Sequence, residues 1–101
     1  GVHFPSSNPK YKDISSLILL TQVAGMVRTA GWRISNVDAT ILAQNPRLVP
    51  FLEDMRARVG QALSTPPERI GIKVTTTDFL GFVGREEGMA ACAVASLISG
   101  P

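Results

Sequence analysis

The sequence has very few residues that could cross-link it or hold a metal ion. Its 101 residues include one cysteine, Cys92, and one histidine, His3. A single cysteine excludes an internal disulfide and favours a reducing compartment, and its alanine-rich surroundings predict a small core residue rather than a nucleophile. A single histidine excludes zinc bound by His3 alone, because a zinc site needs several converging ligands.

Charged residues and long apolar runs are also scarce. Charged residues make up 18% of the chain and the formal net charge is +2. The basic residues are scattered, which argues against a nucleic-acid-binding surface. The longest apolar stretch, Met89 to Ile98, is about half the length of a membrane-spanning helix. With 45% hydrophobic residues, the sequence predicts one soluble domain, residues 1–101.

The first part of the chain predicts a loop followed by a helix. Gly1 to Lys12 is rich in turn-forming residues and is expected to be a loop. A helix is expected next, capped by Asp13 or Ser15 and ending near Gly31, because four apolar residues follow helical spacing. These residues are Leu20, Val23, Ala24 and Val27.

The middle of the chain predicts a strand and a second helix. Arg33 to Leu42 alternates apolar and polar side chains, and so regular a polar face favours a sheet whose second face meets water or other subunits. The helix is expected to start near Pro50. Its inward residues would be Leu52, Met55, Val59 and Leu63, and its outward residues Glu53, Arg56 and Arg58.

The last third predicts a strand, a turn and one ambiguous segment. Ile70 to Val74 alternates as a strand and runs into a threonine tract, and Gly81 to Gly88 is expected to be a turn. Met89 to Ser99 is rich in alanine, which favours a helix, although its small residues also alternate as in a strand. Helices and strands thus alternate, which predicts an α/β or α+β layer with helices covering one face of a sheet.

Two segments combine residues that suit a phosphate ligand. Thr75 to Thr77, Asp78, Gly81, Gly84 and Arg85 offer hydroxyls, a carboxylate, flexible backbone and a guanidinium within a short reach. The same residues also fit a plain threonine-rich strand and a surface turn.

Ala43 to Leu48 follows a strand and precedes a helix, where α/β sheets often bind ligands. On position alone, an ordinary strand-to-helix connection explains this second segment better. On the residues alone, both alternatives stay open.

Four blocks of sequence stand out: Gly1–Pro5, Asn36–Thr40, Ala43–Arg47 and Lys73–Gly88. In order and spacing they resemble the 2-C-methyl-D-erythritol 2,4-cyclodiphosphate synthase family, and they are spread from the first residue to Gly88. The resemblance implies a mixed β-sheet with helices on its outer face, in a homotrimer whose sheets face inward and whose active sites lie between subunits. It also favours a strand for the final segment.

The resemblance implies a phosphorus–oxygen lyase of non-mevalonate isoprenoid biosynthesis, in the bacterial cytoplasm or a plastid-type organelle. Its reaction would convert 4-diphosphocytidyl-2-C-methyl-D-erythritol 2-phosphate to 2-C-methyl-D-erythritol 2,4-cyclodiphosphate and release CMP. The substrate's own phosphate would be the nucleophile, so alignment and charge neutralisation would carry catalysis. The alternative is a non-catalytic trimeric module that binds a nucleotide.

The resemblance also implies a role for each matching residue. Thr76 would stabilise the transition state, Asp78 would ligate magnesium or manganese where the family more often has glutamate, and Arg85 would bind phosphate. Ala43, Gln44, Asn45, Pro46, Arg47 and Leu48 would hold the cytosine, with Arg47 at the place where lysine is common. Thr75 and Thr76 would contact the diphosphate, and Phe4, Pro5, Ser6, Ser7 and Asn8 would lie along the methylerythritol. The other residues expected to bind the substrate are Gly1, Val49, Thr77 and Phe82.

The family's zinc ligands, an Asp-x-His pair and a further histidine, belong to a segment that precedes the first matching block. We therefore expect the zinc ligands outside this chain, upstream of Gly1, and expect the chain to be the C-terminal two-thirds of such a fold. The assignment also requires Thr76, Arg85 and the Ala43–Leu48 loop of a neighbouring copy to converge on one anionic ligand.

Overall fold

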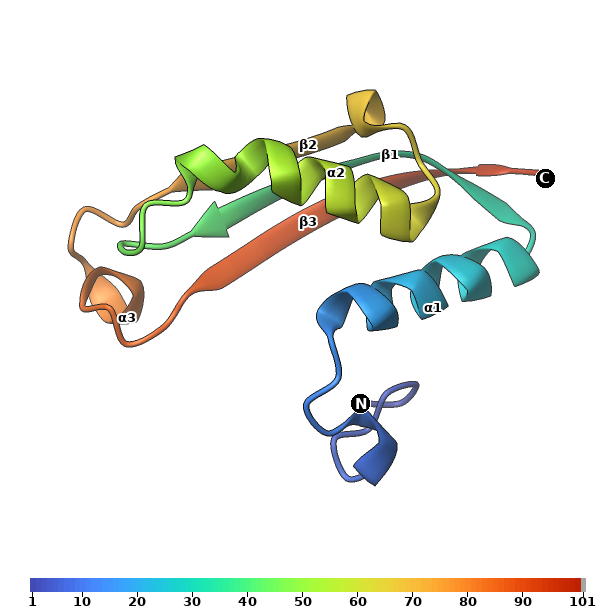
Figure 1. Cartoon of the computed structure of the whole chain (residues 1–101), viewed down its shortest axis with the longest axis horizontal. Helices are drawn as coiled ribbons and strands as arrows, with labels where there is room; N and C mark the ends of the chain where they lie inside the picture. The colour runs from blue at the N-terminus through green and yellow to red at the C-terminus, as the bar shows by residue number, and fades with distance from the viewer. Residues whose placement is uncertain (101) are drawn as a thin grey trace.

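A computed structural model describes residues 1–100 and has the expected α+β composition (Figure 1). The α-helices are α1 (Ser16–Thr29), α2 (Leu52–Leu63) and α3 (Gly81–Gly84), and the strands are β1 (Trp32–Leu42), β2 (Ile70–Thr75) and β3 (Ala90–Ser99). Short 3-10 turns occupy Pro9–Tyr11, Val49–Phe51 and Pro67–Arg69. Among these residues, no helix combines the length and the apolar character needed to cross a membrane.

The three strands form one mixed sheet in the order β2-β1-β3. β1 pairs in parallel with β2, with Ala39 opposite Ile72, and antiparallel with β3, with Ala39 opposite Ala93. The register of β1 against β3 shifts between Ile34 and Asn36. A mixed sheet, which the family resemblance implies, is therefore confirmed.

Helix α1 begins where one of the two expected caps lies. The hydroxyl of Ser15 accepts a hydrogen bond from the Leu17 amide at 3.2 Å, which satisfies one of the free amides at a helix start. The helix is followed by Gly31 at φ +91°. Ala24 is fully buried, whereas Val23 is 38% exposed, so the predicted apolar stripe is correct except at Val23.

Both long helices contribute to a core against the same face of the sheet. Ala24 of α1, Leu63 of α2 and Ile70 of β2 are its buried centre, and α2 lies over the sheet in Figure 1. The half-buried residues around this centre are Leu20, Ile34, Val37, Val59 and Ile72. The expected outward position of Arg56 is wrong in part, because its side chain is 35% exposed and its Nε is buried.

The final segment is the clearest correction to local propensity. Met89 to Ser99 is not a helix, because β3 pairs with β1 along nearly its whole length. The expected burial of Cys92 is also wrong, since Cys92 is exposed in the single chain.

The sheet face opposite the helices carries polar and apolar groups together. Asp38 pairs with Gly71 on one side and with Val94, which is 72% exposed, on the other. The ammonium of Lys73 contacts the Asp38 carboxylate at 2.9 and 3.0 Å. The regular polar face of β1 therefore lies away from the helices.

Candidate functional site at the end of the sheet

The structure brings the two candidate segments together within one chain. The Ala43 amide donates to the Thr75 carbonyl at 3.0 Å, and the Phe79 amide donates to Gln44 Oε1, also at 3.0 Å. Asn45 Nδ2 donates to Glu86 Oε1 at 2.6 Å. This chain's own Ala43–Leu48 loop therefore contacts the turn, and the expected contribution of a neighbouring copy's loop stays a prediction.

The threonine tract ends in a tight turn built from side-chain hydrogen bonds. The Asp78 amide donates to Thr76 Oγ1 at 3.2 Å, and the Thr76 hydroxyl lies 3.4 Å from Asp78 Oδ1. Asp78 and Phe79 have φ values of +52° and +65°, a left-handed conformation that residues other than glycine adopt at a cost. The Thr77 hydroxyl donates to the Leu80 carbonyl at 2.6 Å, which closes the turn.

Glycine allows the short helix α3 to fold back on this turn. A Cβ on Gly84 would lie 2.1 Å from the carbonyl carbon of Phe79, and Gly84 is buried. Gly81, the first residue of α3, has φ +68°. The segment expected to be a plain turn is thus a compact unit whose packing depends on glycine, placed beyond the ends of β1 and β2 (Figure 1).

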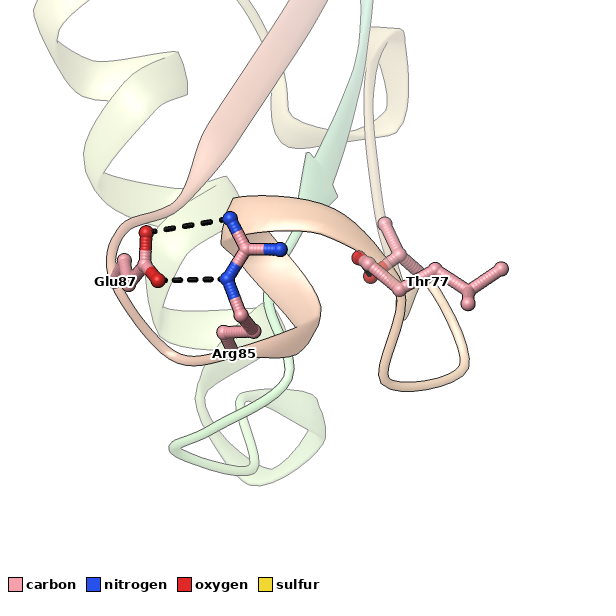
Figure 2. A network of polar contacts seen from close by, with 4 residues as sticks. Thr77, Arg85 and Glu87 are labelled. Atoms are coloured by element: carbon pink, nitrogen blue, oxygen red, sulfur yellow. Dashed lines mark hydrogen bonds and ion pairs between the residues drawn. The ribbon is translucent and has the colours of Figure 1, made fainter.

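Arg85 is engaged by a neighbouring carboxylate rather than by the threonine tract. Its Nε lies 2.7 Å from Glu87 Oε1 and its second guanidinium contact to Glu87 is 3.5 Å. Figure 2 shows this pair on one side of the α3 turn and Thr77 on the other. Within residues 1–100 no hydrogen bond or ion pair joins Arg85 to Thr76, and the expected convergence of these two side chains on one ligand stays a prediction.

The donor set of the turn fits one of the two expected metal ions. Magnesium is usually held by one or two carboxylates together with substrate phosphates, and Asp78 offers an exposed carboxylate beside the Thr76 hydroxyl. Zinc needs three or four converging nitrogen, sulfur or oxygen ligands. Across residues 1–100, no three histidine, cysteine or acidic side chains come together, so these residues do not fit a zinc site.

The N-terminal segment lies apart from the turn. Figure 1 shows it beside the start of α1, whereas α3 lies at the far end of the sheet. The Phe4 and Tyr11 rings pack edge to face at 5.6 Å, and Asn8 Oδ1 accepts from the Lys10 amide at 3.1 Å. The structure therefore does not bring the segment predicted to contact methylerythritol to the same place as Thr76 and Asp78.

Most predicted site residues are open to solvent, with Ala43 as the exception at 2% exposure. Ala43 is buried, and its amide already donates to the Thr75 carbonyl. Half-buried predicted residues are Phe4, Pro5, Asn8, Gln44, Leu48 and Thr77. Exposed ones are Gly1, Ser6, Ser7, Asn45, Pro46, Arg47, Val49, Thr75, Thr76, Asp78, Phe82 and Arg85.

The sequence analysis missed three residues that shape the turn. Phe79 has a left-handed backbone conformation. The Glu86 carboxylate accepts a hydrogen bond from Asn45, and the Glu87 carboxylate forms an ion pair with Arg85. The glycines on either side were the available signal, because they mark a backbone that folds tightly. A hollow of about 660 Å³ lies elsewhere, near Arg28, Trp32 and Thr65, and no predicted site residue lines it.

Comparison with known proteins identifies the family. The YgbB family profile matches residues 1–98. The 2-C-methyl-D-erythritol 2,4-cyclodiphosphate synthase of Syntrophomonas wolfei is 50% identical over 94 residues, which cover 93% of this chain and 60% of the relative. The chain thus spans about three-fifths of that relative's length.

Two solved structures agree with the fold. The bifunctional IspDF of Campylobacter jejuni matches 96% of this chain and 26% of its own, at 37% identity and a TM-score of 0.91. A Plasmodium vivax 2C-methyl-D-erythritol 2,4-cyclodiphosphate synthase matches 86% of this chain and 58% of its own, at 26% identity and a TM-score of 0.82. The fold is that of these two structures. Because the YgbB family profile matches residues 1–98, the chain belongs to the YgbB family.

Proposed function

We propose that this chain contributes the nucleotide and diphosphate part of a cyclodiphosphate synthase active site. The observation that carries the proposal is the contact between the Ala43–Leu48 loop and the Thr75–Arg85 turn within one chain. A loop that offers backbone and amide groups suits a base, and a turn of hydroxyls with a carboxylate suits a diphosphate. The name of the relatives at about half identity supports the same activity.

The proposed reaction is an intramolecular phosphoryl transfer that releases CMP. An oxygen of the substrate's 2-phosphate forms a bond to the terminal phosphorus of the cytidine diphosphate group, and the bond from that phosphorus to the CMP oxygen breaks. The protein then needs to align the two phosphates and offset their negative charge. Thr76, whose hydroxyl is exposed beside Asp78, would donate to the reacting phosphate.

Divalent metal ions belong to the proposal as well. Asp78 would hold magnesium or manganese that is also bound by the diphosphate, and the ion would neutralise charge on the leaving phosphate. Arg85 contacts Glu87 through Nε and Nη2, and its remaining N–H donors would bind a phosphate. We expect zinc ligands to come from outside the described residues, and no step of the mechanism proposed here is assigned to zinc.

Assembly would complete the site. No helix covers the sheet face that carries Asp38, Lys73 and Val94 within residues 1–100. This exposed face supports packing against further copies, in a trimer whose sheets face inward. The Phe4–Asn8 segment lies apart from the turn of its own chain, so the proposal needs another copy to bring this segment to the ligand. The bacterial relatives favour a cytoplasmic setting over a plastid-type organelle.

The test is a comparison of two threonine variants in the full-length protein. Removing one donor that acts on a developing charge typically lowers kcat by about 10²–10³-fold, so Thr76→Ala should lower CMP release by that order. Thr21→Ala is the matched control, because Thr21 is exposed on α1 and its hydroxyl donates to the Leu17 carbonyl at 3.0 Å. Equal kcat/KM in the two variants would defeat the role of Thr76.

A nucleotide-binding module without turnover is the second candidate. The pairing of Arg85 with Glu87 favours it, because a carboxylate beside the guanidinium lowers the local positive potential that would attract a phosphate. A thermal shift assay separates the candidates when it is combined with an assay for CMP release. CDP at about 100 times its Kd should stabilise either protein by about 2.7 kcal/mol, but only the enzyme would release CMP from the full substrate.

A further inference from the structure

Two consecutive residues of the base loop (Ala43–Leu48) contact the phosphate turn (Thr75–Glu87) on either side of α3. Gln44 Oε1 accepts from the Phe79 amide at 3.0 Å, just before α3 begins. Asn45 Nδ2 donates to Glu86 Oε1 at 2.6 Å, just after α3 ends. These bonds join residues 35 and 41 positions apart in the sequence, so they connect two separate segments of the chain.

Both held residues have a backbone that needs support. Phe79 has φ +65° and Glu86 has φ +61°, a left-handed conformation that residues with a Cβ adopt only at an energetic cost. The Phe79 side chain is 74% exposed, so its packing does little to fix the conformation. In that conformation the Phe79 amide donates its hydrogen bond to Gln44 Oε1.

The residues next to these two carry the proposed phosphate and metal contacts. Asp78 precedes Phe79 and Arg85 precedes Glu86. A change at Phe79 would rotate the Asp78 carboxylate, because Asp78 shares the left-handed turn at φ +52°. The orientation of the Asp78 carboxylate, the candidate metal ligand, therefore depends on the hydrogen bond between Gln44 and Phe79.

We propose that Gln44 and Asn45 are positioning residues that join the base loop to the phosphate turn, so that Asp78 and Arg85 keep a fixed place relative to the base. This inference rests on the proposed function and changes one part of it. The carboxamide oxygen of Gln44 is bonded to the Phe79 amide, so Gln44 serves the turn rather than the cytosine edge.

The first test compares ligands that differ only in their phosphates. In the full-length protein, Gln44→Met keeps the length of the side chain and removes the acceptor. Its affinity for CDP with magnesium should fall about fivefold, the effect of losing one hydrogen bond of ~1 kcal/mol. Its affinity for cytidine should stay within about twofold, because the base contacts remain. Gln61→Met, at an exposed position of α2, is the matched control and should change neither.

The second test measures hydrogen exchange at one backbone amide without any ligand. The Phe79 amide should exchange faster in Gln44→Met than in the wild type and in Gln61→Met, because it loses its acceptor. Glu86→Ala and Glu86→Gln probe the other bond. Glu86→Ala should weaken CDP binding more than cytidine binding, whereas Glu86→Gln keeps an acceptor for Asn45 and should show no such selective loss.

Three outcomes would overturn the inference. Equal losses for cytidine and CDP in Gln44→Met would show that Gln44 contacts the base. Unchanged binding of both ligands, or unchanged exchange at the Phe79 amide, would show that the bond does no positioning. If the wild type binds neither ligand, the proposed function fails, and the exchange rate at Phe79 alone then decides whether Gln44 holds the turn.

Discussion

Replacing Gly84 with alanine tests the glycine packing on which the candidate site depends. The added Cβ would lie 2.1, 2.6 and 2.7 Å from three backbone atoms of Phe79. No side chain can turn away to make room, so the turn itself has to open until ordinary contact distances of at least 3.4 Å are restored. We expect a loss of about 2–3 kcal/mol in the free energy of unfolding, the upper part of the range for overpacked interiors.

Denaturant titration measures that loss, and CDP binding measures its local effect. Gly84→Ala should also weaken the binding of CDP. Opening the turn moves Asp78 and breaks the hydrogen bond that the Phe79 amide donates to Gln44. Gly88→Ala is the matched control, because its Cβ would meet only the Phe82 ring at 3.5 and 3.7 Å. A Gly84→Ala protein with wild-type stability and wild-type CDP affinity would refute the argument that close backbone approach holds the turn.

Two further glycines give predictions of different sign. Gly71→Ala places a Cβ 2.7 Å from Asp38 Oδ1, so the carboxylate should swing away from Lys73. The stability loss should stay below about 1 kcal/mol because the ion pair is exposed, and denaturation in a Lys73→Met background should show almost no further loss. Gly25→Ala meets nothing within 4 Å in the interior of α1 and should stabilise by about 0.5–1 kcal/mol, so a lower denaturation midpoint would contradict this prediction.

Elements with local causes could be predicted from the sequence. The Ser15 cap, the apolar spacing of α1 and the alternation of β1 all act between residues close in the chain, and each is present as expected. β3 differs because its cause lies elsewhere. An alanine-rich segment favours a helix by itself, but pairing along β1 satisfies the backbone of β3 and overrides that preference.

The expected interior position of Cys92 shows the same limit in another form. A run of small apolar residues indicates close packing but does not indicate against what it packs. In this chain the helices bury Ala24, Leu63 and Ile70 on the other face of the sheet. Val94, which neighbours Cys92 on the uncovered face, is 72% exposed, so the apolar side chains on this face of β3 have no covering layer within residues 1–100, and the proposed trimer would supply one.

The two halves of the candidate site could each be predicted as segments, but the connection between them could not. A left-handed phenylalanine or glutamate has no marker in its own side chain, since glycine and asparagine are the usual residues there. The bonds that hold Phe79 and Glu86 come from the loop after β1, and only the parallel pairing of β1 with β2 brings that loop beside the turn. It follows that the geometry between base and diphosphate depends on the strand pairing, and that a change in Gln44 should alter phosphate recognition even though Gln44 lies thirty-five positions before Phe79 in the sequence.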